Sequence, residues 1–140
     1  MSDVDGRRGV VAVIERDGRL LVIRRSQHVV APGALCFPGG EIEAGESEEM
    51  ALVRELDEEL GVVIEPLRPV WQSVTTWNVA ISWWRAHLST TAEPRPRESE
   101  VAAVYWMTIK ELQDHEDLLA SNLEFLQGIR AGQIVLDGLN

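Results

Sequence analysis

Three glutamates near the middle of the chain have a spacing that would place their carboxylates on one side of an α-helix. Glu55, Glu58 and Glu59 are three and four residues apart, so a rotation of about 100° per residue brings them within about a third of a turn. Like charges at this spacing destabilise an isolated helix by a few tenths of a kcal/mol per pair. A divalent cation would offset that repulsion, and hard carboxylate oxygens favour Mg²⁺ or Mn²⁺ over softer metals.

The residues around these glutamates predict the helix that would carry them. Ser47 can cap its first turn, and Gly61 suits the left-handed conformation just beyond its last turn. A second side of the same helix is apolar and consists of Leu52, Val53, Leu56 and Leu60. We therefore expect one side of the helix to pack against the protein and the neighbouring side to bind metal.

The run over residues 39–62, GGEIEAGESEEMALVRELDEELGV, resembles the Nudix box in full. The positions that match the family pattern are Gly40, Glu46, Arg54, Glu55, Leu56, Glu58, Glu59, Gly61 and Val62. A chance match at so many fixed positions is very unusual, unlike a match to a short glycine motif. The resemblance implies an α/β (α+β) fold, the Nudix-type α-β-α sandwich with a mixed β-sheet flanked by helices. It also implies an enzyme that hydrolyses a nucleoside diphosphate linked to another group.

The resemblance also implies a role for each polar box residue. The implied metal ligands are Glu55, Glu58, Glu59 and the carbonyl of Gly39. Glu46 resembles the position that supports the loop or orients water, and Arg54 resembles the arginine that holds the box glutamates in place. A divalent ion in such a site neutralises phosphate oxygens and lowers the pKa of a bound water.

Some relatives draw a further metal-binding or base-like glutamate from the loop before the last strand. Glu98 and Glu100 lie in the corresponding polar segment, EPRPRESE, and we favour Glu100. Ordinary surface charge is the alternative, since position is the one feature that argues for a role.

A second stretch, RRSQHVVAPGALCFPGG, resembles the segment of MutT-type enzymes that leads into the box. In those relatives an arginine after the second strand and an asparagine before the C-terminal helix contact the nucleotide, and Arg25 and Asn122 match them here. The alternatives are a surface arginine and a helix N-cap. Trp77, expected in a turn, could stack on a base or simply pack.

Two apolar runs near the N-terminus, residues 10–14 and 20–24, predict a β-hairpin with Asp17 and Gly18 in its turn. The remaining expected elements are strands at 70–75, 79–88 and 101–107, a loop at 93–100 and a helix at 123–129. Trp83 and Trp84 are adjacent in one of these strands and must point to opposite faces, so we expect at most one in the core.

The whole chain restricts the choice of partner and compartment. Its 140 residues suit a single domain over residues 1–140, and its formal net charge of −10 argues against binding to nucleic acid polymers or anionic membranes. Cys36 is the one cysteine, which excludes an intramolecular disulfide and favours the cytoplasm. We expect a nucleotide as the partner, and a homodimer is compatible with the family.

The favoured substrate is a nucleoside triphosphate, normal or oxidised. ADP-ribose, nucleotide sugars and dinucleoside polyphosphates are the alternative substrates, but the proline or tyrosine that often marks those enzymes after the box is missing from residues 73–77. A catalytically silent nucleotide-binding domain is a third reading, and it is disfavoured because such domains commonly lose box glutamates.

Overall fold

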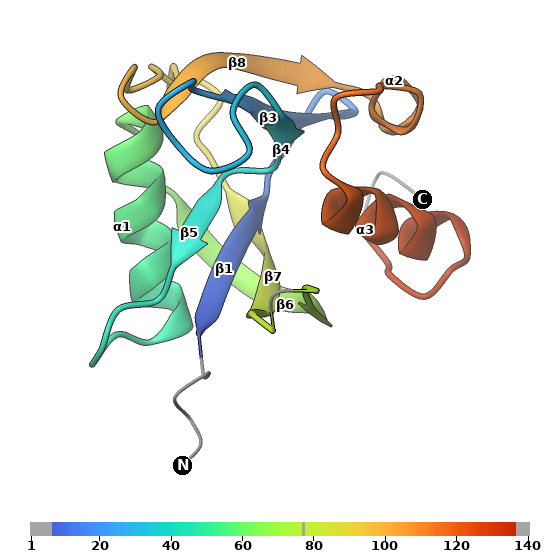
Figure 1. Cartoon of the computed structure of the whole chain (residues 1–140), viewed down its shortest axis with the longest axis horizontal. Coiled ribbons are helices and arrows are strands. Elements are labelled where there is room, and N and C mark those ends of the chain that lie inside the picture. The colour runs from blue at the N-terminus through green and yellow to red at the C-terminus, as the bar shows by residue number, and fades with distance from the viewer. Residues whose placement is uncertain (1–6, 77, 137–140) are drawn as a thin grey trace.

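The computed structural model describes residues 7–76 and 78–136 and contains two β-sheets with helices beside them (Figure 1). In the first sheet the order is β5 (Gly39–Glu41), β1 (Arg8–Val13), β7 (Ala80–His87) and β6 (Glu65–Val74). Strand β1 runs parallel to β7, while β1 and β5, and also β6 and β7, are antiparallel. This sheet is therefore mixed, as the family resemblance implied.

The second sheet contains β3 (Arg19–Arg25) between β8 (Val101–Met107) and the two short strands β2 (Glu15–Arg16) and β4 (Leu35–Cys36). The turn at Asp17 and Gly18 is confirmed, since both residues have positive φ angles, 53° and 80°. The predicted hairpin partner was wrong. Strand β3 pairs with β2, whereas β1 leaves the hairpin and joins the other sheet.

Helix α1 (Glu48–Leu60) confirms the helix predicted for the box. The hydroxyl of Ser47 accepts a hydrogen bond from the amide of Met50, and Gly61 takes a left-handed conformation with φ 65°. The buried apolar residues of the helix are Ala51, Leu52, Leu56 and Leu60. They pack with Val10 and Ala12 of β1 in one hydrophobic cluster, so α1 covers one face of the first sheet (Figure 1).

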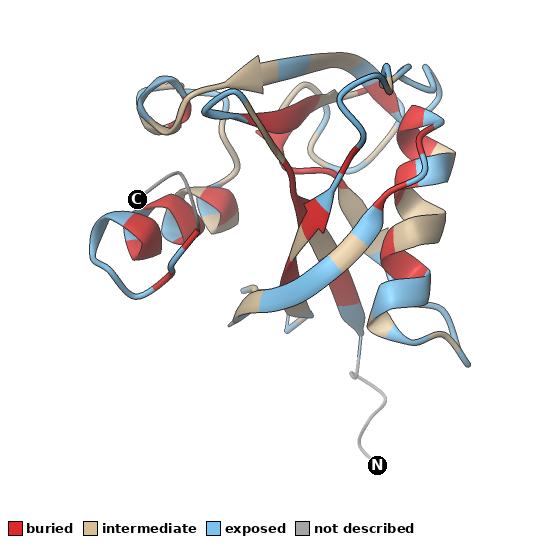
Figure 2. Cartoon of the chain, turned by 180° about the vertical axis from the view of Figure 1, so that it is seen from behind, coloured by how far each residue is buried: buried red, intermediate tan, exposed pale blue. Residues whose placement is uncertain are grey.

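The other face of that sheet is covered by α3 (Ala120–Arg130). Trp83 points into the cluster with Phe125 of α3, and Trp84 points into the cluster with α1. The expectation that at most one of these tryptophans enters the core was therefore wrong, because both faces of the sheet are covered. Figure 2 shows the resulting buried residues in the strands and on the inner sides of α1 and α3.

The C-terminal part of the chain differs from the prediction at two places. A short helix, α2 (Ile109–Gln113), follows β8 and begins with a capping box between Thr108 and Glu111. Helix α3 begins at Ala120, and Leu119 occupies its N-cap position. Within the described ranges, none of the helices is both long and apolar enough to span a membrane.

Candidate active site

Arg54 is bonded to three of the box glutamates at the centre of α1. Its guanidinium donates to Glu46 (Nε to Oε2, 2.6 Å), Glu55 (Nη1 to Oε1, 2.9 Å) and Glu58 (Nη1 to Oε1, 3.0 Å). It also donates to the main-chain carbonyl of Glu41 at 2.9 Å, which ties the helix to the end of β5. These contacts turn the carboxylates toward a common region, and hydrogen bonding to Glu46 raises the pKa of Arg54.

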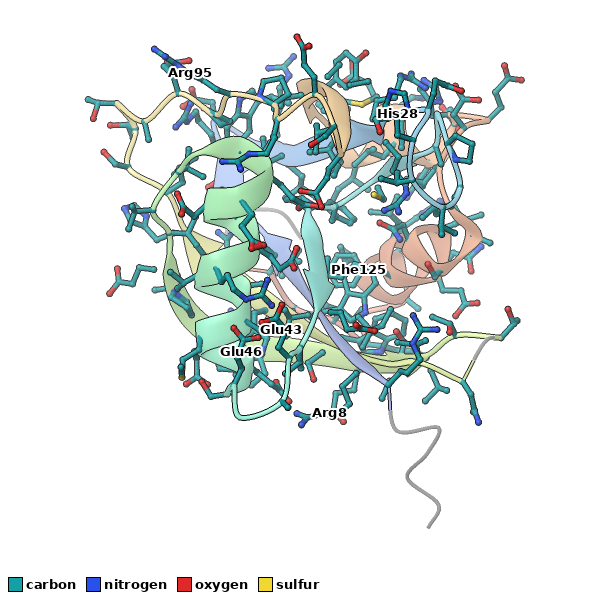
Figure 3. All side chains as sticks on the ribbon, turned by 60° about the vertical axis from the view of Figure 1, so that its left-hand side comes forward. Arg8, His28, Glu43, Glu46, Arg95 and Phe125 are labelled. Atoms are coloured by element: carbon teal, nitrogen blue, oxygen red, sulfur yellow. The ribbon has the colours of Figure 1, made fainter. Side chains whose placement is uncertain are left out.

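Glu46 links the loop before α1 to the helix. Besides its two bonds to Arg54, it accepts a hydrogen bond from the amide of Glu43 at 2.8 Å. Figure 3 shows both glutamates in this loop, beside the N-terminal half of α1. The guanidinium, followed by the Glu43 amide, lowers the pKa of Glu46 to about 2, so this carboxylate is ionised at neutral pH.

Glu59 is the buried member of the cluster, with 7% of its surface exposed. Its Oε1 accepts a hydrogen bond from the amide of Gly39 at 3.1 Å. Burial, and next the charge of Glu55, raise the pKa of Glu59 to about 8, and the charge of Glu100 acts in the same direction. Burial, together with two neighbouring carboxylates, therefore disfavours the ionised form of Glu59.

Glu55 lies against the backbone of Gly40. A Cβ atom at Gly40 would collide with the carboxylate of Glu55, so a larger residue here would displace that side chain from its present position. Burial raises the pKa of Glu55, Arg54 opposes that change, and the charges of Glu58 and Glu100 add to it. The charges of Glu58 on the same helix and of Glu100 from another segment therefore both act on Glu55.

The loop over residues 93–100 is attached to the C-terminal end of α1. The amide of Arg95 donates to the carbonyl of Leu60 at 2.8 Å, and the amide of Arg97 donates to the carbonyl of Glu59 at 2.9 Å. Arg95 lies beside that end of the helix in Figure 3. This attachment places Glu100 close enough for its charge to raise the pKa of both Glu55 and Glu59.

The chemistry of these residues fits a hard divalent cation. Carboxylate oxygens are the ligands that Mg²⁺ and Mn²⁺ prefer, and a cation beside Glu59 would offset the burial that disfavours its ionised form. As the side chains stand, however, no three acidic, histidine or cysteine groups in the described part of the chain enclose one point. Both oxygens of Glu58 face Arg54 instead.

A cavity of about 220 Å³ adjoins this end of the sheet. Its lining includes Gly39 and Gly40 next to the glutamates, Arg25 and Cys36 from the second sheet, and Asn122 from the first turn of α3. Two predicted nucleotide-contacting residues, Arg25 and Asn122, therefore line the same cavity. It is large enough for part of a small ligand, since one water occupies about 30 Å³ in the liquid.

Arg25 and Asn122 are held by the segments around them. The Nε atom of Arg25 donates to the carbonyl of Val30 at 2.6 Å, and the Oδ1 atom of Asn122 accepts from the amide of Phe37 at 2.9 Å. The alternative assignment of Asn122 as a helix N-cap is wrong, because α3 begins two residues earlier. Trp77 lies outside the described residues.

The cavity also contains residues that the sequence analysis did not name as part of a site, among them Arg7, Gly9 and Glu41. The sequence feature that could have grouped them is the alternation of side chains along a strand, which places every second residue on one face. That alternation could not be used without knowing that β1 pairs with β5, with Gly9 opposite Glu41.

Comparisons with known proteins agree with this geometry. A family model described as NUDIX domain matches residues 5–128. The chain is 35% identical over 109 residues to a Mycobacterium tuberculosis protein with the provisional name 8-oxo-dGTP diphosphatase 2, covering 75% of each chain. A shorter match, 49% identical over 53 residues, covers 38% of this chain and 39% of the CTP pyrophosphohydrolase of Escherichia coli.

A crystal structure of a MutT NUDIX hydrolase from Burkholderia pseudomallei has a similar fold. It is 29% identical to this chain, with a TM-score of 0.73, and the similarity covers 87% of this chain and 96% of that one.

Proposed function

Because this chain belongs to the Nudix hydrolase family, we propose that it hydrolyses a nucleoside triphosphate, normal or oxidised, to the nucleoside monophosphate and pyrophosphate. The observation that carries this proposal is the cluster of Glu55, Glu58 and Glu59, which adjoins Gly39 and Gly40 in the lining of a cavity. The same cavity is lined by Arg25 and Asn122. With a divalent cation bound, the cluster would suit the phosphates of such a substrate, and the cavity would suit its nucleoside.

We propose Mg²⁺ as the resident ion, with Mn²⁺ able to replace it. Glu55, Glu58, Glu59 and the carbonyl of Gly39 would hold the metal, with Glu100 contributing from the neighbouring loop. When bound, the ion supplies charge neutralisation at the phosphate oxygens and a water of lowered pKa.

The other groups of the site prepare it for that ion and for the substrate. Arg54 sets the directions of the Glu55 and Glu58 carboxylates, and Glu46 fixes Arg54 from the loop before the helix. Arg25 brings positive charge to a strongly acidic site. Because Arg25 also lines the cavity, it can attract the substrate phosphates from that side.

The tuberculosis and Escherichia coli relatives carry names with different substrates, 8-oxo-dGTP and CTP. Both are nucleoside triphosphates, which supports that substrate class. A Methanocaldococcus jannaschii relative, 41% identical over 54 residues, is named ADP-ribose pyrophosphatase, so ADP-ribose is the second candidate substrate. The base is a finer property and depends on the side chains that line the cavity.

A product assay tests the proposal directly. The purified protein with Mg²⁺ would be incubated with normal and oxidised nucleoside triphosphates, ADP-ribose and diadenosine polyphosphates, and the products would be separated by chromatography. We expect a monophosphate and pyrophosphate from a triphosphate. Binding of nucleotide with no phosphorus-containing product from any compound would instead support the silent binding domain.

We propose that the protein acts on small nucleotides in the cytoplasm, and we propose a homodimer as the assembly to test by light scattering.

A further inference from the structure

One end of the cavity contains an ion pair that the proposed reaction does not use. Arg7 and Glu41 both line the cavity, and the Nε atom of Arg7 lies 3.3 Å from Oε2 of Glu41. Their side chains are 65% and 61% exposed, and an ion pair this exposed adds little to stability. Its position in the cavity therefore suggests a role in binding.

The strand register fixes where this pair lies relative to the glutamates. Gly39 is paired with Val11 and Glu41 is paired with Gly9, so these four residues lie on one face of the sheet. Arg7 continues the same face, and its carbonyl accepts a hydrogen bond from the amide of Ala80 at 3.0 Å. Val11 is the fourth residue after Arg7, which is about 13 Å along an extended strand. The cavity thus extends from the proposed phosphate site at Gly39 to the ion pair.

Between Gly39 and the ion pair, the cavity is lined by apolar residues and by a glycine without a side chain. Gly9 has no side chain, and Val11 and Ile81 lie beside it. A Cβ atom at Gly9 would lie 3.3 Å from the carbonyl oxygen of Gly40 and 3.9 Å from Ile81. A flat apolar floor of this kind suits one face of an aromatic ring, and a polar pair at its end suits the edge of that ring.

We propose that Arg7 and Glu41 select the base of the substrate and favour guanine. This inference rests on the proposed function, because it places the phosphates at the glutamates. A guanidinium donates to the O6 and N7 acceptors of guanine, and a carboxylate accepts from base N–H groups. Guanine presents O6 next to two N–H groups, so the cation and the anion of one adjacent pair can both be satisfied. In uracil and thymine the single N–H lies between two carbonyl groups. A carboxylate that accepts from this N–H would be repelled by the carbonyl oxygens on either side of it.

Kinetics of base preference test this inference. For Glu41→Gln and Arg7→Met we expect kcat/KM for GTP to fall about tenfold to a hundredfold, from about 1–3 kcal/mol per bidentate contact. The loss should lie in KM, with kcat changed less than twofold and kcat/KM for UTP nearly unchanged. Glu65→Gln and Arg19→Met are matched controls, since they make the same charge changes at exposed strand ends.

A charge swap separates base selection from a structural ion pair. The double variant Arg7→Glu/Glu41→Arg keeps an ion pair but exchanges the donor and acceptor positions. A structural pair would be restored by the swap, whereas a base-selecting pair should remain impaired for GTP. Retention of the parent order of GTP over UTP in the single variants and in the swap would overturn the inference while leaving the hydrolase proposal intact.

Product binding decides the question even if hydrolysis fails. If the parent protein hydrolysed no triphosphate, the proposed function would fall, and calorimetry with GMP and UMP would still test the pair. Tighter binding of GMP that is lost in Glu41→Gln supports the inference. Equal binding of both monophosphates by the parent contradicts it.

Discussion

Glu58 and Asp57 are adjacent acidic residues of α1 with different surroundings. Glu58 is bonded to Arg54 within the cluster, whereas Asp57 is exposed and outside it. We expect Glu58→Gln to lower kcat by orders of magnitude, because loss of a ligand charge weakens the metal that stabilises the phosphate. Asp57→Asn is the matched control and should keep the parent rate. Full activity of Glu58→Gln at saturating Mg²⁺, with an unchanged circular dichroism spectrum, would rule out Glu58 as a ligand.

The raised pKa of Glu59 predicts a pH-dependent effect on stability in the absence of metal. Its pKa is about 8 in the folded protein and about 4.5 ordinarily. Its favourable contribution to the free energy of unfolding is therefore fully present below pH 4.5. That contribution is lost as the pH rises toward 8, where burial opposes the ionised form. Glu59→Gln should therefore raise Tm by several degrees at pH 8.5 in a chelator and change it little at pH 4.5.

Calorimetric scans of parent and Glu59→Gln at these two pH values would check the sign. Gln keeps an oxygen that can accept the hydrogen bond from Gly39, so the comparison isolates the charge. A lower Tm for the variant at pH 8.5 would mean that the carboxylate is stabilised by the fold.

At the level of elements, the N-cap residue of α1 stabilises the first turn of the helix. The hydroxyl of Ser47 accepts from the amide of Met50 at 3.1 Å. Ser47→Ala should destabilise the protein by about 1 kcal/mol, which corresponds to a fall in Tm of about 4 °C. Ser47→Asp should restore stability because aspartate caps equally well. Chemical denaturation of the three proteins measures the difference, and equal midpoints would show that the cap contributes nothing.

The elements that the sequence predicted well are those with local signals. Helix α1 has its cap, its apolar side and its terminal glycine within one short segment, and the turn at Gly18 is likewise local. The partner of β1 could not be predicted in this way, because β1 pairs in parallel with β7 far along the chain. Burial of Trp84 depended on the same long-range arrangement, since α1 covers its face of the sheet.

The candidate site divides along the same line. The glutamates of α1 share one helix, so periodicity was sufficient to group them, and the family pattern assigned their roles. Arg25 and Asn122 come from β3 and α3, and their meeting in one cavity depends on how the two sheets are placed. Arg7 and Glu41 had no distinguishing local pattern, and the register of β1 with β5 brought them together.

At the scale of the whole molecule, excess negative charge should couple metal binding to stability. The chain has a formal net charge of −10, and the carboxyl groups of Glu55, Glu59 and Glu100 lie close together in the fold. A cation that binds the folded state alone stabilises it by about 2.7 kcal/mol at a hundred times its Kd. We therefore expect Mg²⁺ or Mn²⁺ to raise Tm by several degrees at pH 7.5, and EDTA to reverse the change.

Screening of the overall charge could raise Tm without a site, so the scans must compare solutions of equal ionic strength. Under that condition, Mg²⁺ should raise Tm more than Na⁺ only if the protein has a site for a divalent ion. Glu58→Gln should lose most of the Mg²⁺-dependent increase, whereas Asp57→Asn, which removes an equal charge from the same helix, should keep it. An equal increase in both variants would locate the effect in the general field of the protein and would argue against a metal site on α1.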